Sequence, residues 1–92
     1  MIILHKEENN KGIFYIEENG VKVAELTYKR TPDNKIVADH TWVTPEKEGQ
    51  GIAGKLFNEL VAFLRKENLK LIPLCSYVVA KTKKEEFKDL LA

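Results

Sequence analysis

Apolar and polar positions alternate with a period of two over much of the first half of the chain, which predicts antiparallel strands. Two such runs, 12–18 and 21–28, flank the dipeptide Asn19-Gly20. Asn-Gly between alternating runs is a strong hairpin signal, because a type I′ turn needs positive φ at both central residues. The sequence therefore predicts a tight β-hairpin here.

Two further strands are expected before the pattern changes. Residues 31–34, with Pro32 presetting φ, form a second turn. This turn leads into a third clear strand over 36–43, while residues 2–4 are expected to form a short edge strand. The first half is thus read as a sheet.

The period changes from two to about four after residue 50, which predicts a helix with one apolar face. Its stripe is made of Ile52, Ala53, Leu56, Phe57, Leu60, Val61, Phe63 and Leu64. Asn68 is a plausible left-handed stop for this helix. Residues 69–74 follow as a short buried strand, which should run parallel to 37–43 through a right-handed crossover.

A short terminal helix is expected over 82–91. Thr82 is its N-cap and Glu85 stands three residues on, as in a capping box. Four strands followed by helix, strand and helix indicate an α+β fold with a mostly antiparallel mixed sheet. No linker or repeat interrupts the chain, so residues 1–92 are read as a single domain.

Composition narrows the classes of function. The 92 residues carry 15 basic and 14 acidic side chains, a formal charge of +1, which argues against nucleic-acid binding. One cysteine and two distant histidines exclude a disulfide framework and lack metal-ligand spacing. No segment reads as a signal peptide or membrane span. We therefore expect a cytoplasmic monomer with no membrane or nucleic-acid partner.

The segment 43–56 is the part of the sequence that most clearly indicates a ligand-binding site. A strand runs into a turn with three glycines in six residues, Gly49, Gly51 and Gly54, and a helix starts at once. Glycines let backbone N–H groups converge, and a helix N-terminus adds about half a positive charge, which favours phosphate. A P-loop does not fit, because Leu56 stands where Ser or Thr must bind magnesium. Residues 49–54 also match the GxGxxG pattern of dinucleotide-binding folds, but that fold needs a second βαβ unit, which the sequence does not predict.

The same segment resembles motif A of the GNAT acetyltransferase superfamily, with Glu48, Gly51 and Ala53 at its marked positions. The resemblance covers about 36–77 and implies that the loop and helix start cradle the pyrophosphate of acetyl-CoA. It also implies that the preceding strand pairs with the pantetheine arm. The cofactor-binding residues implied are Trp42, Val43, Glu48, Gly49, Gln50, Gly51, Ile52, Ala53, Gly54 and Lys55.

Two short stretches are similar to a small GNAT-like subfamily with a strand His and a later Cys-Ser: 39–43 before the loop, and 73–76 after the helix. Two departures from the superfamily stand out. Glu48 replaces the usual Gln or Arg, and a carboxylate about 4 Å from a phosphate costs about 1 kcal/mol in water. The helix pair that shapes the acceptor pocket in most GNAT enzymes has no place here, so the acceptor site is open or absent.

His40 and Cys75 are the candidate catalytic residues. Cys75 is either a small buried hydrophobe or a thiol near the thioester, activated by His40. His40 is either a hydrogen-bonded core residue or the general base. Alternation places it on one face with Ile36, Ala38 and Trp42, unless a bulge breaks the count. Tyr77 is either core or the acid for the departing thiolate.

The resulting hypothesis is an acetyl-CoA-binding protein that transfers acetyl to an unknown amine, directly or through a thiol. The alternative is a non-catalytic acyl-CoA-binding module without an acceptor pocket. A third reading is an interaction scaffold that binds no ligand, against which the glycine density at a helix start argues. Small-molecule acyl-CoA is the expected partner, and no metal is expected.

Overall fold

The computed structural model describes all 92 residues. A five-stranded sheet has the order β1-β2-β3-β4-β5. Its strands are β1 (Leu4–Glu8), β2 (Lys11–Glu18), β3 (Val21–Arg30), β4 (Lys35–Val43) and β5 (Lys70–Pro73). Successive strands from β1 to β4 pair antiparallel, and β4 pairs parallel with β5. The predicted α+β class with a mixed sheet is confirmed.

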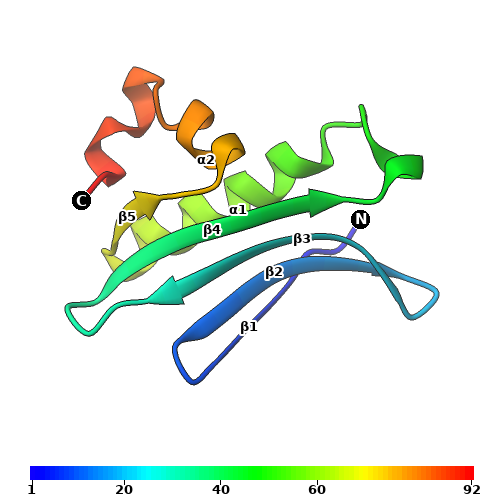
Figure 1. Ribbon diagram of the computed structural model, residues 1–92, viewed down its shortest axis with the longest axis horizontal. Coiled ribbons are helices and arrows are strands. Elements are labelled where there is room, and N and C mark those ends of the chain that lie inside the picture. The colour runs from blue at the N-terminus through cyan, green and yellow to red at the C-terminus, as the bar shows by residue number, and fades with distance from the viewer.

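Three helical elements lie on one side of this sheet: α1 (Ile52–Glu67), α2 (Ser76–Lys81) and η2 (Glu85–Leu90) (Figure 1). A fourth, the short turn η1 (Pro45–Lys47), lies beyond the end of β4. Phe57 of α1 meets Phe87 of η2 edge to face at 5.1 Å, and the ammonium of Lys81 in α2 lies 5.6 Å from the Phe57 ring centroid. The opposite face of the sheet carries no helix.

Helix α1 buries the stripe that its periodicity predicted. Ile52, Leu56, Phe57, Leu60 and Leu64 are buried against the inner face of the sheet. Each such side chain contributes roughly 1.5–3 kcal/mol when taken fully out of water. The helix ends at Asn68, which has the expected left-handed conformation with φ 55° and ψ 49°. The crossover connection from β4 through α1 to β5 is therefore held to the sheet by a continuous apolar contact between α1 and the inner face.

Both predicted turns form. Asn19 and Gly20 have φ of 52° and 76°, which is the positive pair that the hairpin requires. The second turn closes through Thr31, whose N–H bonds the carbonyl of Lys35 at 2.8 Å. The edge strand, however, covers Leu4–Glu8 rather than residues 2–4. Its register is set by pairing with β2, which a three-residue apolar run does not reveal.

The predicted terminal helix over 82–91 is wrong. Thr82 is not an N-cap: it ends α2, and its hydroxyl donates to the Val78 carbonyl at 2.9 Å. The helical start lies earlier, at Cys75, and the last residues form the 3-10 segment η2. Leu90 is nevertheless buried, and Phe87 packs on the core, as the apolar pattern indicated.

A polar network joins β1 to the core at the far end of the sheet. The Tyr28 hydroxyl donates to Glu7 at 2.7 Å, so His5 Nε2, also 2.7 Å away, donates its proton to Tyr28. Arg30 completes the network with two hydrogen bonds to Glu7, at 2.9 and 3.0 Å. His5 also stacks on Phe14 at 4.1 Å. His5 is thus anchored by contacts on one side, although it lies in an exposed strand.

This network makes the fold sensitive to acid. Burial lowers the pKa of His5 below its ordinary 6.5, and hydrogen bonding from Arg30 lowers the pKa of Glu7 below its ordinary 4.5. Each group binds a proton less readily in the folded chain than in the unfolded one. The stability that they contribute is therefore present above these ordinary values and lost as the pH falls through the folded pKa values.

We expect the free energy of unfolding to fall in two steps as the pH drops, first below 6.5 and then below 4.5. Urea unfolding at a series of pH values from above 6.5 to below 4.5 measures this free energy. In His5→Gln the first step should shrink, and in Glu7→Gln the second. Identical pH profiles for the wild type and both variants would contradict the assignment.

No helix of the protein is both long and apolar enough to cross a membrane.

Candidate functional site

The turn before α1 has the backbone geometry that its glycines allow. Gly49 and Gly51 have φ of 80° and 76°, and a Cβ at either position would meet open space. Gly51 is the N-cap of α1, and no side chain caps the helix there. The first turn also lacks an acidic residue, which helices commonly place there. The N-terminus of α1 is therefore left electropositive.

Backbone donors are concentrated at this turn. No acceptor within the chain takes the N–H of any residue from 49 to 54, and the first α1 N–H that bonds is that of Lys55, to the Gly51 carbonyl at 3.2 Å. Unpaired N–H groups of a helix start, together with its dipole, favour an anion. The arrangement can hold phosphate groups.

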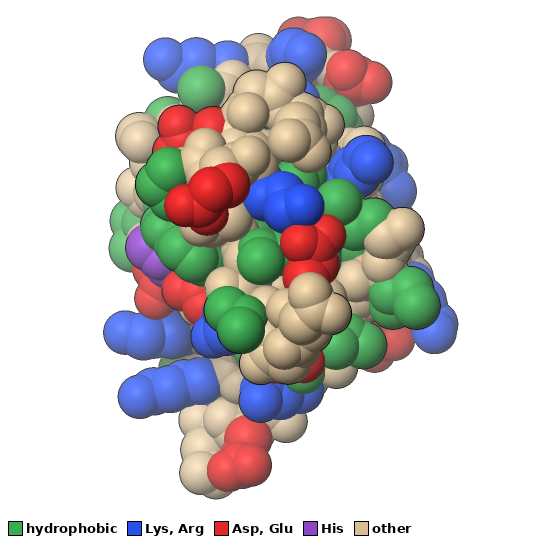
Figure 2. All heavy atoms as spheres, turned by 90° about the vertical axis from the view of Figure 1, so that its right-hand side faces the viewer, with side chains coloured by type: hydrophobic (Ala, Val, Ile, Leu, Met, Phe, Trp, Pro, Cys, Tyr) green, Lys and Arg blue, Asp and Glu red, His purple; other side chains and the backbone are tan.

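A cavity of about 250 Å³ lies beside these donors. It is lined by Val43, Lys47, Glu48, Gly49, Gly51, Ile52, Ala53, Gly54 and Tyr77. Figure 2 looks at this end of the molecule, where basic and acidic side chains lie among exposed atoms of the backbone and of uncharged polar side chains. Seven of the ten residues predicted to bind cofactor line this cavity, and Trp42, Gln50 and Lys55 do not.

The charges around the cavity are mixed. Glu48 contributes a carboxylate to its wall. Lys47 also lines it, but its ammonium is paired with Glu18 of the hairpin at 2.9 Å. Basic side chains therefore contribute less to phosphate binding than in a lysine-rich site. The backbone N–H groups are the main hydrogen-bond donors for an anion.

The edge of β4 is open next to this cavity. Pairing with β5 stops at Ala38, whose carbonyl accepts from the N–H groups of Leu74 and Cys75 at 2.9 and 3.1 Å. Thr44 N–H bonds Val23 of β3, and hydrogen-bonded pairs alternate along an antiparallel ladder. The backbone groups of Thr41 and Val43 therefore point away from β3. An extended ligand arm can pair with them.

A bulge at Asp39 reverses the alternation in β4. Thr27 lies opposite His40, whereas the next residue, Tyr28, lies opposite Ala38, so Asp39 is an extra residue in the ladder. Ile36 and Ala38 are buried, but His40 and Trp42 are exposed on the outer face. Simple alternation therefore predicted the wrong face for His40. The strand contains the bulge that was named as the condition under which this alternation would fail.

His40 and Cys75 have different partners. His40 Nε2 lies 3.1 Å from a carboxylate oxygen of Glu25 on the outer face. Cys75 is half-buried at the start of α2, with its sulfur 3.2 Å from the Thr41 hydroxyl and 3.5 Å from the Val78 N–H. Successive strand residues point to opposite faces, so His40 and Thr41 diverge. The structure thus pairs the cysteine with Thr41 and the histidine with Glu25.

Sequence reasoning singled out neither Thr41 nor Glu25. Their roles depend on the strand register, because Glu25 lies opposite Trp42 and Thr41 lies opposite Leu26. Tyr77, for which two readings stayed open, lines the cavity, and its hydroxyl lies 3.6 Å from where a Gly54 Cβ would stand. Burial raises the pKa of Tyr77, so its hydroxyl keeps its proton at neutral pH.

Comparisons with known proteins agree with this geometry. A family profile described as GCN5-related N-acetyl-transferase matches residues 13–90. A GCN5-like N-acetyltransferase candidate from Staphylococcus aureus, solved by NMR, is 36% identical, with a TM-score of 0.66. That alignment covers 97% of this chain and 87% of the other.

More distant structures share the fold. A ribosomal-protein-alanine N-acetyltransferase from Brucella melitensis is 19% identical with a TM-score of 0.63, over 74% of this chain and 52% of that one. A predicted acetyltransferase from Clostridium acetobutylicum, crystallised with acetyl-CoA, is 22% identical with a TM-score of 0.61. That alignment covers 76% of this chain and 52% of the other.

This chain thus spans about half the length of these two proteins. No curated protein sequence matches it closely enough to count as a relative. The family profile nevertheless covers most of the chain, and the Staphylococcus aureus structure matches almost all of it. The chain therefore belongs to the GCN5-related N-acetyltransferase family.

Proposed function

We propose that the protein binds acetyl-CoA and transfers its acetyl group to an amine. The observation that carries the proposal is the set of unpaired N–H groups at residues 49–54, which open on the cavity at the start of α1. They fit the pyrophosphate, because N–H groups at a helix start bind anions without a basic side chain. Gln50 and Lys55 border the same turn and complete the cradle.

The open edge of β4 supports the rest of the binding mode. The outward-facing backbone groups of Thr41 and Val43 pair with the pantetheine arm, and Trp42 lies between them. The arm then runs toward the point where β5 leaves β4, at Ala38. This course brings the acyl end to the two candidate catalytic residues, His40 on the outer face and Cys75 on the inner one.

Acetyl-CoA supplies an acyl thioester, and the residues around it supply proton transfer. In direct transfer, the neutral His40 imidazole removes a proton from the acceptor amine. A new C–N bond forms, the C–S bond breaks, and the CoA thiolate takes up a proton. Tyr77, which keeps its proton, is the candidate donor. His40 Nε2 lies 3.1 Å from a Glu25 carboxylate oxygen, so a proton on Nε2 faces that carboxylate and Nδ1 is the basic nitrogen.

The thiol route tests Cys75 directly. If Cys75 is the acyl carrier, incubation with acetyl-CoA adds one acetyl group to the wild type, and Cys75→Ser removes this label from residue 75. Serine is a preferred N-cap, so stability should change by less than about 1 kcal/mol. Intact-protein and peptide mass spectrometry measure the label. Its absence from wild-type Cys75 leaves only direct transfer.

Catalysis itself is tested by CoA release with a panel of amines. His40→Gln should lower turnover by about 100-fold, the size typical of a lost general base, without changing the affinity for acetyl-CoA. A wild type that binds acetyl-CoA but releases no CoA with any amine would instead be a non-catalytic acyl-CoA-binding module. The uncovered outer face of the sheet is the feature that favours this second candidate.

A further inference from the structure

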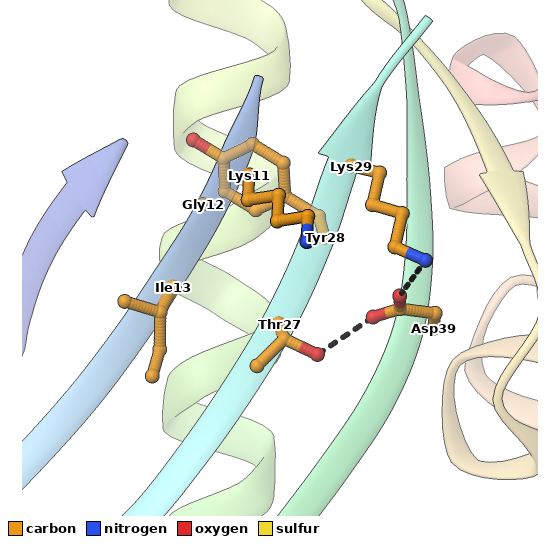
Figure 3. Close-up of a pocket in the computed structure, with 7 residues that line it drawn as sticks. All are labelled: Lys11, Gly12, Ile13, Thr27, Tyr28, Lys29 and Asp39. Carbon is orange, nitrogen blue, oxygen red and sulfur yellow. Dashed lines mark hydrogen bonds and ion pairs between the residues drawn. The ribbon is translucent and has the colours of Figure 1, made fainter. Parts of the chain in front are cut away.

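The outer face of the sheet carries a second hollow, away from the cavity at α1. It has a volume of about 310 Å³. The side chains of its walls come from three strands: Lys11 and Ile13 of β2, Thr27 and Lys29 of β3, and Asp39 of β4 (Figure 3). Its floor is backbone, because Gly12 has no side chain and the Tyr28 ring lies on the other side of the sheet. A volume of this size is typical of small-ligand sites.

The hollow has an uncompensated positive charge. Lys11 and Lys29 lie directly opposite each other on β2 and β3, an arrangement that repulsion disfavours. The one acidic side chain in the hollow, Asp39, accepts from the Thr27 hydroxyl at 2.6 Å and lies 3.9 Å from the Lys29 ammonium. Lys11 makes no ion pair. An anion between the two ammonium groups would relieve the repulsion.

The neighbouring side chains limit the kind of anion. The carboxylate of Asp39 in the same wall repels a dianion more than a monoanion. Ile13 adds an apolar surface. A carboxylate attached to a small apolar group fits this combination better than a phosphate does.

The hollow also adjoins the candidate base. Ile13, Thr27 and His40 form one cross-strand row, and Lys11 and Lys29 form the next. Two residues along a strand span about 7 Å, which flexible lysines can shorten toward the next row. Asp39 puts negative charge on one side of His40, and Glu25, whose other oxygen pairs with Lys22 at 2.9 Å, lies on its other side at 3.1 Å. Lys11 and Lys29 put positive charge beyond Asp39. The face is therefore complementary to a ligand with an ammonium at one end and a carboxylate at the other.

We propose that this hollow binds the carboxylate of the acetyl acceptor, so that the acceptor is an amine of the amino-acid class. The inference rests on the proposed acetyl transfer. Lys11 and Lys29 are its specificity-determining residues: they hold the carboxylate while the amine lies toward His40. The acceptor then needs no helix-lined pocket, because the open sheet face itself supplies both charges.

Titration of the ¹⁵N-labelled protein with three probes tests the site: L-leucine, L-leucinamide and isoamylamine. We expect leucine to shift the backbone amide resonances of Lys11, Thr27 and Lys29. The two probes without a carboxylate should not. Lys11→Met and Lys29→Met should each weaken leucine binding by about tenfold, as expected for one charged hydrogen bond. Lys66→Met, on the exposed side of α1, is the matched control and should bind as the wild type does.

Equal binding of leucine and leucinamide, or unchanged affinity in both hollow variants, would overturn the inference. Thermal unfolding with acetyl-CoA on the same samples separates the two proposals. A protein that is stabilised by acetyl-CoA but shows no leucine-dependent shifts keeps the proposed cofactor and loses the acceptor site. One that binds leucine without responding to acetyl-CoA loses the acetyl-transfer proposal, and with it the role of the hollow as an acceptor site.

Discussion

Replacing Gly12 with alanine is expected to lower the free energy of unfolding by about 3 kcal/mol, the upper range for an overpacked core. An added Cβ would overlap the Cζ and hydroxyl end of the Tyr28 side chain, far inside van der Waals contact. That ring is only 1% exposed, and its hydroxyl is fixed between His5 and Glu7. It therefore has little room to move. For a chain of this length the loss corresponds to a fall in Tm of about 12 °C or more.

A double-mutant cycle shows whether the Tyr28 ring is the cause. In a Tyr28→Leu background the Gly12→Ala substitution should cost less than about 1 kcal/mol, because the ring is gone. Gly54→Ala is the matched control. Its Cβ would stand 3.6 Å from the Tyr77 hydroxyl, an ordinary contact, and alanine favours the helix. Equal stability of Gly12→Ala and the wild type would contradict the close packing of β2 on Tyr28.

Replacing Ala53 with glutamate is expected to weaken acetyl-CoA binding by about 100-fold while leaving the fold intact. Ala53 lines the cavity in the first turn of α1. A carboxylate there repels the pyrophosphate, and in a partly shielded site such repulsion reaches a few kcal/mol. The same charge favours the positive helix end, so stability should stay level or rise by about 0.5 kcal/mol.

The opposite signs of these two effects identify the helix end as the anion site. Ala53→Gln adds nearly the same volume without charge and should keep most of the affinity. Isothermal titration measures binding, and urea unfolding measures stability. Equal affinity of the glutamate variant and the wild type would mean that the phosphates do not lie at α1.

The elements set by local chemistry were predictable from the sequence. Asn19-Gly20 forms its hairpin because few other dipeptides tolerate positive φ twice, and Asn68 ends α1 for the same reason. The apolar stripe from Ile52 to Leu64 repeats with the helical period alone, so only one face of α1 could be the buried one. The glycine turn also has the conformation that its residues allow, with Gly49 and Gly51 at positive φ.

The features that depend on pairing between distant segments were not predictable. The bulge at Asp39 exists only relative to β3, so counting along β4 alone put His40 on the wrong face. The contact between Thr41 and Cys75 depends on where β5 stops. The final helix was misplaced because Thr82 and Glu85 match a capping box in sequence, whereas Thr82 is buried with its hydroxyl bonded back to α2.

Thermal unfolding with and without acetyl-CoA tests the central claim, that the start of α1 and the edge of β4 form an acetyl-CoA site. At a ligand concentration about 100 times the dissociation constant, binding adds about 2.7 kcal/mol. We expect Tm to rise by about 10 °C or more with acetyl-CoA and with CoA, and by much less with adenosine. No rise at millimolar acetyl-CoA would contradict the account, and the glycine turn would then be a structural cap alone.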